Sequence, residues 1–236
     1  MFGFGKKQWV CTVCGYNAIG KRPNRCAFCA AQSKCLMAAS RTQRLFKVKE
    51  LPFNEQVSQL RCSPVFGLDN AAYRIDTGNG VVLIDCPAIY CRNLPPAEAI
   101  FFTHKDFIGA ANQYRKAWGC EVYLHRLDAE LSTVAQHSVT NSFAGDFEKY
   151  GIQALHIGGH SPGFTVYIWK DVLFICDYAY PPGVGMTLNP HGPREATRDG
   201  ASRLADIMAD HELSTVCGYN YLADFGPWQR EFMRLV

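Results

Sequence analysis

Two Cys-x-x-Cys pairs near the start of the chain constrain its folding more than any other feature. The pairs are Cys11 with Cys14 and Cys26 with Cys29, and eleven residues separate them. So short a segment has too few apolar residues to form its own core, whereas four thiolates at this spacing can surround one tetrahedral ion. We therefore predict that residues 1–40 form a small module that folds around one iron or zinc ion.

The length and composition of the chain allow a large domain beside this module. With 236 residues, of which 48% are hydrophobic, the chain can bury a sizeable core and is not disordered. No apolar run approaches the roughly 18 residues that a membrane helix needs, and the N-terminus lacks the apolar region and cleavage site of a signal peptide. We therefore expect no membrane span, a cytoplasmic protein, and cysteines that are metal ligands or small core residues rather than disulfides.

The net charge of +3 conceals an uneven distribution. Residues 1–49 contain ten Lys or Arg and no Asp or Glu, while the rest of the chain contains 14 basic and 21 acidic residues and is formally −7. The basic excess can face an acidic protein surface, nucleic acid or the acidic body of the same protein. We expect docking on the body, and nucleic acid is disfavoured because the basic stretch lacks a helix or an aromatic platform beyond Trp9 and Tyr16.

From residue 70 onward, short apolar runs alternate with helical patterns, which indicates an α/β architecture. Residues 70–76 and 81–85 form a predicted hairpin around the Gly/Asn turn at 77–80. Residues 31–60 resemble a polar linker that becomes a first edge strand. The further elements that we expect are a proline-started helix at 94–98, a helix at 110–118, and strands at 99–103, 121–124, 164–169 and 172–176.

The stretch from Leu155 to Asp177 organises the second half of the chain. It places His160 on a tight loop, Gly-Gly-His-Ser-Pro-Gly, and Asp177 at the end of the second of two following strands. A histidine on a glycine-bounded loop and a carboxylate at the tip of a following strand can converge on one metal ion. The alternative is a buried histidine and an unrelated aspartate at a strand end.

The first module resembles a known kind of metal domain. Its pattern, Trp-x-Cys-x-x-Cys-Gly-Tyr followed by Cys-x-x-Cys, is similar to the rubredoxin-like domains of rubrerythrin-type proteins, with Trp9 and Tyr16 at the aromatic positions. The resemblance implies one iron that passes single electrons, whereas zinc ribbons with the same spacing are structural. Ala27 and Ala30 depart from the pattern, which usually has proline and glycine there. The sequence leaves the choice between iron and zinc open.

The rest of the chain, from about residue 45 to the C-terminus, resembles the metallo-β-lactamase fold superfamily. Five blocks carry the resemblance in order, NAAYRIDTGNGVVLID, AIFFTHKDFIGA, VYLHRLDAEL, LHIGGHSPG and LFICD. The resemblance implies that residues 41–236 form an αββα sandwich of two mixed sheets, with a metal site at the edge where loops meet. A rubredoxin-like module joined to this fold is also similar to the flavodiiron proteins.

The metal motif of that superfamily, THxHxDH, is altered in this chain. Residues 103–107 read THKDF, as if two residues with the second histidine were deleted, and Phe107 replaces the third histidine. An alignment without a gap would instead make His104 the second histidine and put Phe102 in the place of the first. We prefer the deletion, because AIFFTH then matches the strand and its end.

One complete set of ligands survives these changes. The resemblance implies a single iron or zinc at His104, His160 and Asp177, the combination that single-iron persulfide dioxygenases of this fold use. The final histidine of the motif falls at about Tyr219. We expect Asp106 and Tyr219 to lie beside the metal as catalytic neighbours that hydrogen-bond a ligand or water. A vestigial site that holds no metal is the alternative.

Two classes of function follow. The first is a redox metalloprotein, an oxidoreductase in which the rubredoxin-like centre exchanges electrons with the single-metal site and with a redox partner protein. The second is a non-catalytic scaffold or binding protein with a structural zinc ribbon. A metal-dependent hydrolase ranks third, because the loss of one metal site leaves its activated water hard to place.

The remaining histidines have expected roles outside metal ligation. His156 occupies a position that supports the loop of His160, and His125 matches a superfamily position outside the metal site. His137, His191 and His211 lie in polar contexts and are expected on the surface.

Overall fold

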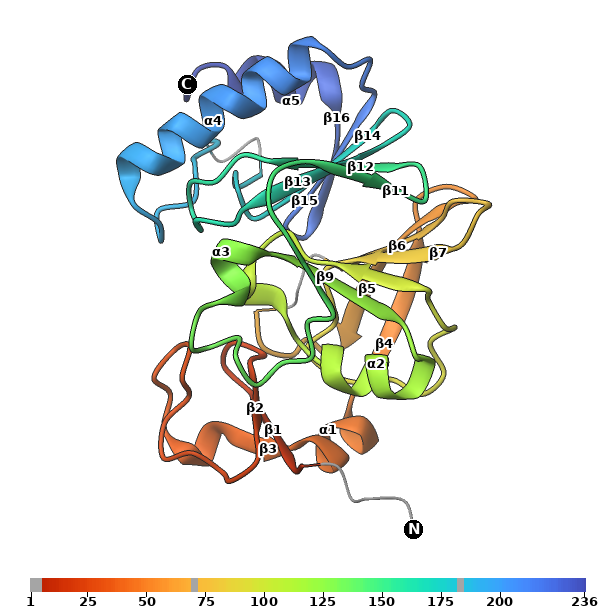
Figure 1. Ribbon diagram of the computed structural model, residues 1–236, viewed down its shortest axis with the longest axis vertical. Coiled ribbons are helices and arrows are strands. Elements are labelled where there is room, and N and C mark those ends of the chain that lie inside the picture. Colours follow the sequence, from red (N-terminus) through yellow and green to blue (C-terminus); the bar gives the residue numbers. More distant parts are fainter. Residues whose placement is uncertain (1–5, 69–71, 182–184) are drawn as a thin grey trace.

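The structure is a computed structural model that describes residues 6–68, 72–181 and 185–236. A small module lies at one end of the molecule, and above it stand two sheets with helices on their outer faces (Figure 1). The strand order follows the chain within the larger domain, so that the first sheet is complete before the second begins. None of the described helices is long and apolar enough to cross a membrane.

The module consists of a three-stranded antiparallel sheet in the order β2-β1-β3, followed by a short helix. Its elements are β1 (Gln8–Cys11), β2 (Asn17–Ile19), the 3₁₀ turn η1 (Ser33–Cys35), β3 (Leu36–Ala38) and α1 (Ala39–Leu45). The predicted boundary at residue 40 lies in α1, between the last strand of the module and the first strand of the larger domain. The interpretation of residues 31–60 as a linker was wrong for β3 and α1, because two such short elements carry no apolar period.

Seven strands form the first sheet of the domain, in the order β10-β9-β8-β7-β6-β5-β4. They are β4 (Lys47–Pro52), β5 (Val57–Ser63), β6 (Ala72–Asp76), β7 (Val81–Ile84), β8 (Ala99–Phe101), β9 (Glu121–His125) and β10 (Asn141–Phe143). The 3₁₀ turn η2 (Lys105–Phe107) follows β8, and α2 (Ala111–Trp118) and α3 (Arg126–Ala129) flank β9 in sequence. The strand β4 forms the edge, as the sequence predicts for this region.

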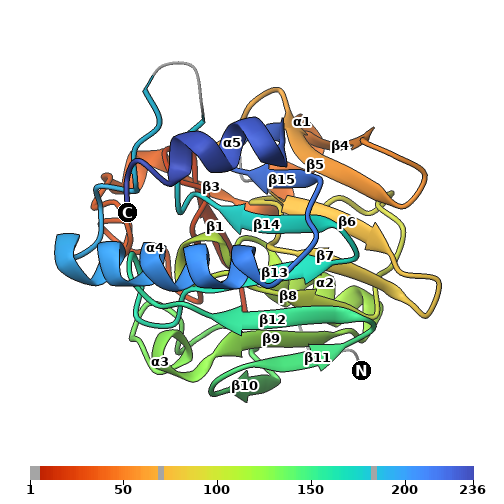
Figure 2. The ribbon, with the colours of Figure 1, turned by 90° about the horizontal axis from the view of Figure 1, so that it is seen from above.

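Six strands form the second sheet, in sequence order from β11 to β16. They are β11 (Phe147–Lys149), β12 (Ile152–His156), β13 (Thr165–Trp169), β14 (Val172–Cys176), β15 (Thr215–Gly218) and β16 (Tyr221–Asp224). The helices α4 (Arg194–Ala209) and α5 (Phe225–Phe232) cover its outer face (Figure 2). The layers are therefore helix, sheet, sheet and helix.

The main core fills the space between the two sheets and extends under α4 and α5. Every residue of β13 and β14 is buried, because sheet and helix cover these strands on both faces. The helix α4 places its buried residues at helical spacing, at Thr197, Gly200, Ala201, Leu204 and Met208. The apolar runs of the sequence thus become the central strands, and their ends reach the edge where the loops meet.

The segment at residues 94–98 does not form the predicted helix. It has bends and irregular backbone without regular secondary structure. The prolines Pro95 and Pro96 explain the difference, since each proline disfavours the α conformation of the residue before it. The hairpin of β6 and β7 forms around the turn at 77–80, although the predicted start of its first strand, residues 70–71, lies outside the described residues.

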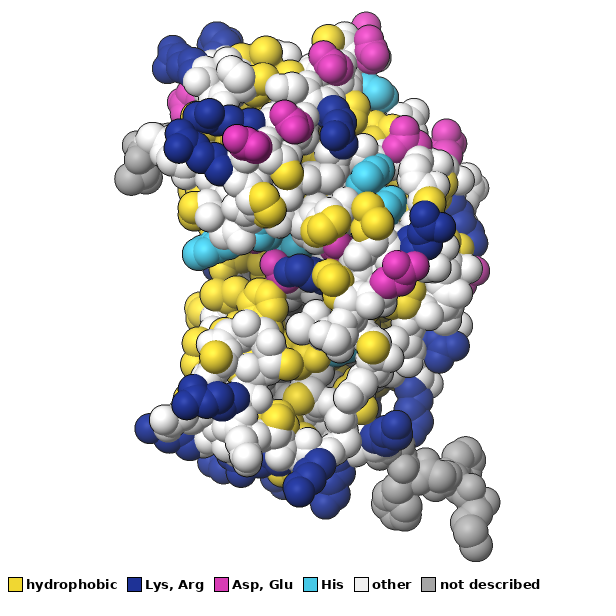
Figure 3. Space-filling model, turned by 60° about the vertical axis from the view of Figure 1, so that its left-hand side comes forward, with side chains coloured by type: hydrophobic (Ala, Val, Ile, Leu, Met, Phe, Trp, Pro, Cys, Tyr) yellow, Lys and Arg dark blue, Asp and Glu magenta, His cyan; other side chains and the backbone are white. Residues whose placement is uncertain are grey.

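The module packs on the domain through hydrogen bonds and an apolar cluster. The Tyr16 hydroxyl donates to the carbonyl of Thr133 at 2.8 Å, and the Asn17 amide donates to the carbonyl of Ala88 at 2.8 Å. The shared cluster consists of Val10, Ala39, Cys62, Phe66, Ala88 and Ile89. Among described residues, no ion pair joins residues 6–49 to the rest of the chain. The module thus docks on the domain, and the described contacts between them are hydrogen bonds and apolar packing rather than ion pairs. Figure 3 shows Lys and Arg gathered at the module end of the surface.

Candidate metal centres

The four cysteines of the module converge on one point. The Sγ atoms of Cys11 and Cys29 are 3.6 Å apart, and those of Cys14 and Cys26 are 3.7 Å apart. Four sulfurs at about 2.3 Å from one ion in a tetrahedron lie about 3.8 Å from one another, so these distances fit a bound ion. The hydrogen bond between Cys14 and Cys26 lowers the pKa of the Cys26 thiol and raises that of Cys14, and burial raises the pKa of Cys11 to about 11. Most of the four thiols would therefore release a proton when a metal binds.

Four side chains from different loops converge at the edge of the two sheets, and we call them the histidine–carboxylate centre. His104 follows β8, Asp106 lies in η2, His160 lies in the loop after β12, and Asp177 follows β14. The Nε2 atom of His104 lies 3.4 Å from Asp106 Oδ2 and 3.5 Å from Asp177 Oδ1. The Nε2 atom of His160 lies 3.3 Å from Asp106 Oδ2 and 4.0 Å from Asp177 Oδ2.

Three of these four distances, from 3.3 to 3.5 Å, are close to the spacing of ligands around one ion, and the distance between His160 and Asp177, 4.0 Å, is longer. Ligand atoms about 2.1 Å from a metal lie about 3.0 to 3.4 Å apart, depending on geometry. The Nε2 atoms of both histidines and the Oδ1 atom of Asp177 are buried and have no hydrogen-bond partner. Buried polar atoms rarely stay unpaired, and a metal ion would satisfy all three at once. The donor set therefore fits a metal, and Asp106 lies as close to the histidines as Asp177 does.

A hydroxyl and a buried carboxylate orient His104 from behind. The Thr103 Oγ1 atom lies 2.9 Å from His104 Nδ1 and donates to Asp85 Oδ2 at 2.8 Å. Since the hydroxyl donates to Asp85, it accepts from Nδ1–H, so Nε2 is the nitrogen that faces the centre and would supply its lone pair when a metal displaces its proton. Burial raises the pKa of Asp85 to about 6. Asp85 has a left-handed backbone, with a φ of 58°, which costs energy in a residue other than glycine.

The loop of His160 is held by Asp128, whose carboxylate is fully buried. Asp128 accepts hydrogen bonds from the Ser161 hydroxyl and from the Gly163 and Lys105 backbone amides. One carboxylate therefore fixes both the loop that carries His160 and the turn that carries Asp106. Gly159 lets the loop pass close to its neighbours, because its φ is +102° and an added Cβ would lie 2.3 Å from the Tyr178 hydroxyl.

Asp177 is positioned by a single amide. The Asn189 side chain donates to the Asp177 carbonyl at 3.0 Å and to its Oδ2 atom at 3.0 Å, which leaves Oδ1 free to face His104. The preceding residue, Cys176, has a φ of 49° at the end of β14. The thiol of Cys176 lies close enough to His104 and Asp177 to form a further group of potential ligands.

The carboxylates set the protonation of the centre when no metal is bound. Burial lowers the pKa of His104, but the nearby Asp177 and Asp106 carboxylates outweigh burial and raise it to about 9. Burial raises the pKa of Asp106, yet the His104 and His160 rings, whose Nε2 atoms lie 3.4 and 3.3 Å from its Oδ2 atom, outweigh burial and hold the pKa well below its usual range. A proton thus occupies His104 at neutral pH in the metal-free protein.

A cavity of about 530 Å³ opens beside the centre. Phe107 and Tyr219 line it, and their rings stack with centroids 5.8 Å apart. Phe28 of the module lines the same cavity, and the ammonium group of Lys105 lies 5.6 Å from the centre of its ring. Phe28 precedes the metal ligand Cys29 in sequence, so the module meets the second centre at this cavity. Figure 3 shows histidine side chains reaching the surface at the waist of the molecule.

The structure thus brings all the predicted residues of this site together. His104, His160, Asp177 and Asp106 form the centre, and Tyr219 lines its cavity. Sequence reasoning assigned no role to the supporting residues, which are Asp85, Asp128, Asn189 and Phe28. A signal for Asp85 was present, since it ends an apolar strand as Asp177 does. Asn189 comes from a segment without a pattern, and Phe28 lies in the second Cys-x-x-Cys pair, whose pattern specifies the two cysteines but not the residues between them.

Of the other histidines, His156 contacts the loop where it was expected, and His137 lies in a different environment from the one expected. The Nε2 atom of His156 lies 2.9 Å from the Pro162 carbonyl, so His156 does contact the loop of His160. His137 was expected on the surface, but it is buried and packs edge-to-face on Tyr16, with ring centroids 5.5 Å apart. The expectation was wrong because the module covers this part of the domain.

Comparison with solved structures confirms the predicted fold. DIM-1 metallo-β-lactamase superposes with a TM-score of 0.61 at 9% identity, over 79% of this chain and 96% of that chain. A metallo-β-lactamase from Hirschia baltica superposes with a TM-score of 0.60 at 15% identity, over 79% of this chain and 97% of that chain. TTHA1623, solved in a di-iron-bound form, superposes with a TM-score of 0.53 at 24% identity, over 70% of this chain and 94% of that chain. No family model and no curated protein matches the sequence. The larger domain has the metallo-β-lactamase fold, and the four-cysteine cluster lies in the module before it.

Proposed function

We propose that this protein is a redox metalloprotein, in which a four-cysteine iron centre exchanges single electrons with one metal ion at the histidine–carboxylate centre. The observation that carries this proposal is the convergence of His104, His160 and Asp177, since the Nε2 atoms of both histidines and the Oδ1 atom of Asp177 are buried without hydrogen-bond partners. Iron held by thiolates supplies one-electron transfer, and iron held by two histidines and a carboxylate supplies open positions for dioxygen or substrate.

A single metal ion fits the second centre better than two. Among described residues, the two possible ligand groups outside the module share His104, so they describe one site. Phe107 and Tyr219, which stand at the positions of two further histidines of the superfamily motif, stack on one another beside the centre and offer no imidazole ligand. The di-iron-bound form of TTHA1623 supports iron as the metal, although that protein holds two ions.

The residues of this chain have clear tasks in such a protein. Asp85 and Thr103 keep the Nε2 atom of His104 unprotonated when a metal is bound, and Asn189 keeps one oxygen of Asp177 directed to the centre. Phe107 and Tyr219 make the cavity more apolar, which favours a substrate with an apolar part. Phe28, the residue before Cys29, lines the cavity beside the second centre, so electrons would pass between the centres through this contact.

Metal content and spectroscopy test the proposal. We expect protein grown with ample iron to contain two irons per chain, with the electron paramagnetic resonance signal of a ferric four-thiolate centre. His104→Ala should remove one iron and keep the thiolate signal, whereas Cys11→Ser should remove the thiolate signal. The control is His211→Ala, because His211 is bonded to Gln153 away from both centres. One zinc per chain that survives His104→Ala would refute the redox proposal.

A second candidate function is a non-catalytic scaffold with a structural zinc ribbon. The close packing of the module favours it, since an added Cβ at Gly67 would lie 2.6 Å from the backbone nitrogen of Gly15. Redox proteins also have rigid modules, so this observation alone does not displace the first proposal. Zinc in the module and no metal at the second centre, in protein grown with both metals, would establish the scaffold.

A further inference from the structure

The contact between the module and the domain covers one histidine of the domain. His137 lies in the segment between α3 and β10, and only 8% of its surface is exposed. Its ring packs edge-to-face on the ring of Tyr16 from the module, with centroids 5.5 Å apart. The Tyr16 hydroxyl donates to the Thr133 carbonyl in the same segment, so this segment is part of the docking surface.

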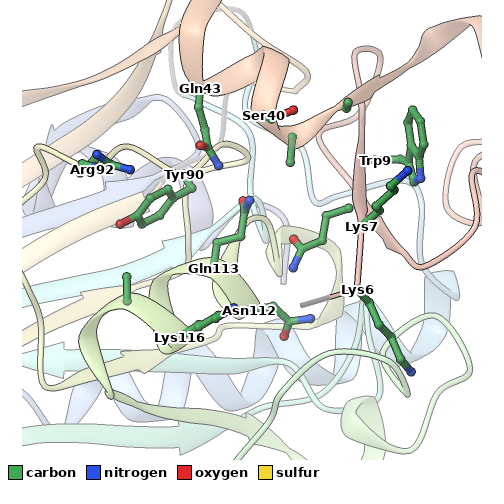
Figure 4. A pocket seen from close by; sticks show the side chains of 14 residues that line it. Lys6, Lys7, Trp9, Ser40, Gln43, Tyr90, Arg92, Asn112, Gln113 and Lys116 are labelled. Carbon is green, nitrogen blue, oxygen red and sulfur yellow. The ribbon is translucent and has the colours of Figure 1, made fainter. Parts of the chain in front are cut away.

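Asn112 of α2 fixes the backbone on both sides of His137. Its side-chain amide donates to the Gln136 carbonyl at 3.3 Å, and its oxygen accepts from the Ser138 backbone amide at 2.6 Å. Asn112 also lines a cavity of about 760 Å³ between the module and α2 (Figure 4). The cations that line this cavity are all exposed to water, whereas His137 is covered. They are Lys6, Lys7, Arg92 and Lys116.

The docked ring is in a place that disfavours its charged form. Both ring nitrogens of His137 are buried, and neither makes a hydrogen bond. Burial lowers the pKa of His137 below 6.5, and it outweighs the backbone groups of Asn17, Val134 and Thr133, which act in the opposite direction. An imidazolium in this place would lose its hydration without gaining a full set of acceptors.

The module offers no carboxylate to balance a charge on His137. Residues 1–49 contain no Asp or Glu. On the domain side, Arg126 and Glu130 line the same cavity as His137, and both of these opposite charges are exposed to water. On the module side, burial and the thiols of the four-cysteine centre raise the pKa of Tyr16, so its ring stays neutral.

We propose that protonation of His137 releases the module from the domain, so that docking weakens as the pH falls. The undocked histidine is solvated and titrates near 6.5, whereas the docked ring stays neutral to lower pH. The undocked state therefore binds more protons, and the stabilisation of docking is complete above about 6.5 and declines below it. Release withdraws Phe28 from the cavity at the histidine–carboxylate centre, so acid opens that cavity. This inference does not depend on the function proposed for the metal centres.

Hydrogen exchange on the metal-loaded full chain between pH 7.5 and 5.5 tests the proposal. The backbone amides of residues 133–139 report docking through their protection factors, which remove the effect of pH on the intrinsic exchange rate. In the unaltered protein we expect protection to fall by up to about tenfold, the limit for one proton taken up on undocking. His137→Phe keeps a ring against Tyr16 but cannot be protonated, so its protection should stay constant.

His211→Gln is the matched control, because His211 bonds the Ile207 carbonyl and the Gln153 side chain within the domain. It should keep the pH dependence of the unaltered protein, and its loss in this variant would overturn the proposal. An equal fall of protection in His137→Phe would assign the effect to the thiolates of the four-cysteine centre and would also overturn it. A nuclear magnetic resonance titration of the His137 ring needs no variant. A midpoint at or above 6.5, or constant protection in the unaltered protein, would show that His137 does not control docking.

Discussion

At the scale of single residues, the second centre depends on side chains that never touch the metal. Thr103 joins the buried Asp85 to His104, and its hydroxyl has a fixed direction because the carboxylate can only accept. Residues in this position usually tune metal affinity, since they fix the ring and its tautomer. The hydroxyl of Thr103 is therefore the most informative single group to remove.

We predict that Thr103→Val weakens metal binding at the histidine–carboxylate centre by about 10- to 100-fold. It should also lower the free energy of unfolding by about 1–3 kcal/mol, because Asp85 loses a hydrogen bond in a buried place. Chelator competition and urea unfolding measure the two effects. Thr42→Val is the control, because it removes a buried hydroxyl that bonds the Ala39 carbonyl far from the centre. Equal metal affinity in both variants would contradict the role of Thr103.

The protonation of His104 predicts how metal uptake depends on pH. The folded metal-free protein raises the pKa of this residue from 6.5 to about 9, so a proton must leave when a metal binds. Metal affinity should therefore rise about tenfold for each pH unit up to about 9. The same shift stabilises the metal-free protein fully below pH 6.5, and this contribution is lost as the pH rises through about 9. Metal titrations between pH 6.5 and about 9 check the change in affinity, and thermal unfolding over the same pH range checks the change in stability. A metal affinity that does not change with pH would contradict the raised pKa of His104.

At the scale of elements, strands were easier to predict from the sequence than the short helices. The strands β13 and β14 are continuous apolar runs between glycine-rich and polar turns, so both their type and their ends were visible. The helix α1 has seven residues and only two buried ones, too few for a helical period. The predicted helix at 94–98 failed because two prolines suit turns as well as a helix start. The site followed the strands, since its three proposed ligands lie shortly after β8, directly after β14 and in the loop before β13.

The loop of His160 gives a prediction at this scale. We expect Gly159→Ala to lower stability by at least about 2 kcal/mol and to abolish metal binding at the second centre, since its Cβ would meet the Tyr178 hydroxyl at 2.3 Å. Gly151→Ala is the matched control, because this glycine also has a positive φ, +72°, but an added Cβ meets nothing within 4 Å. The control should lose only about 1 kcal/mol and keep its metal. If both variants lose the metal, backbone strain rather than contact with Tyr178 is responsible.

At the scale of the whole molecule, the two metal centres are linked by packing rather than by charge. Composition revealed that the first 49 residues are basic and the rest acidic, but it could not reveal which surfaces meet. The contacts depend on single groups, such as the Tyr16 hydroxyl and the Asn17 amide, which bond backbone carbonyls of the domain. Such bonds leave no pattern in a sequence.

This packing predicts the response of the protein to salt. Because no described ion pair joins the module to the domain, raising NaCl from about 50 mM to about 500 mM should leave the docking of the module unchanged. Hydrogen exchange at the amide protons of β1 and β2 measures the docking. Faster exchange of these amides at high salt would show that charge holds the module after all.

The last prediction concerns loss of the first metal. Cys26→Ser removes one ligand of the four-cysteine centre, and the module contains little apolar surface to compensate. The module should unfold, while the domain keeps its two sheets because their core does not include module residues. Unfolding of the module also removes Phe28 from the cavity and uncovers His137, so proteolysis should cleave residues 1–40 and leave the remainder intact.

Cys35→Ser is the matched control for this variant, since Cys35 lies beside the centre but outside its ligand group. It should keep the metal, the protease resistance and the exchange pattern of the unaltered protein. A Cys26→Ser protein that resists proteolysis as well as the control would show that packing on the domain, and not the ion, holds the module. In that case the four-cysteine centre would be free to serve electron transfer without a structural task.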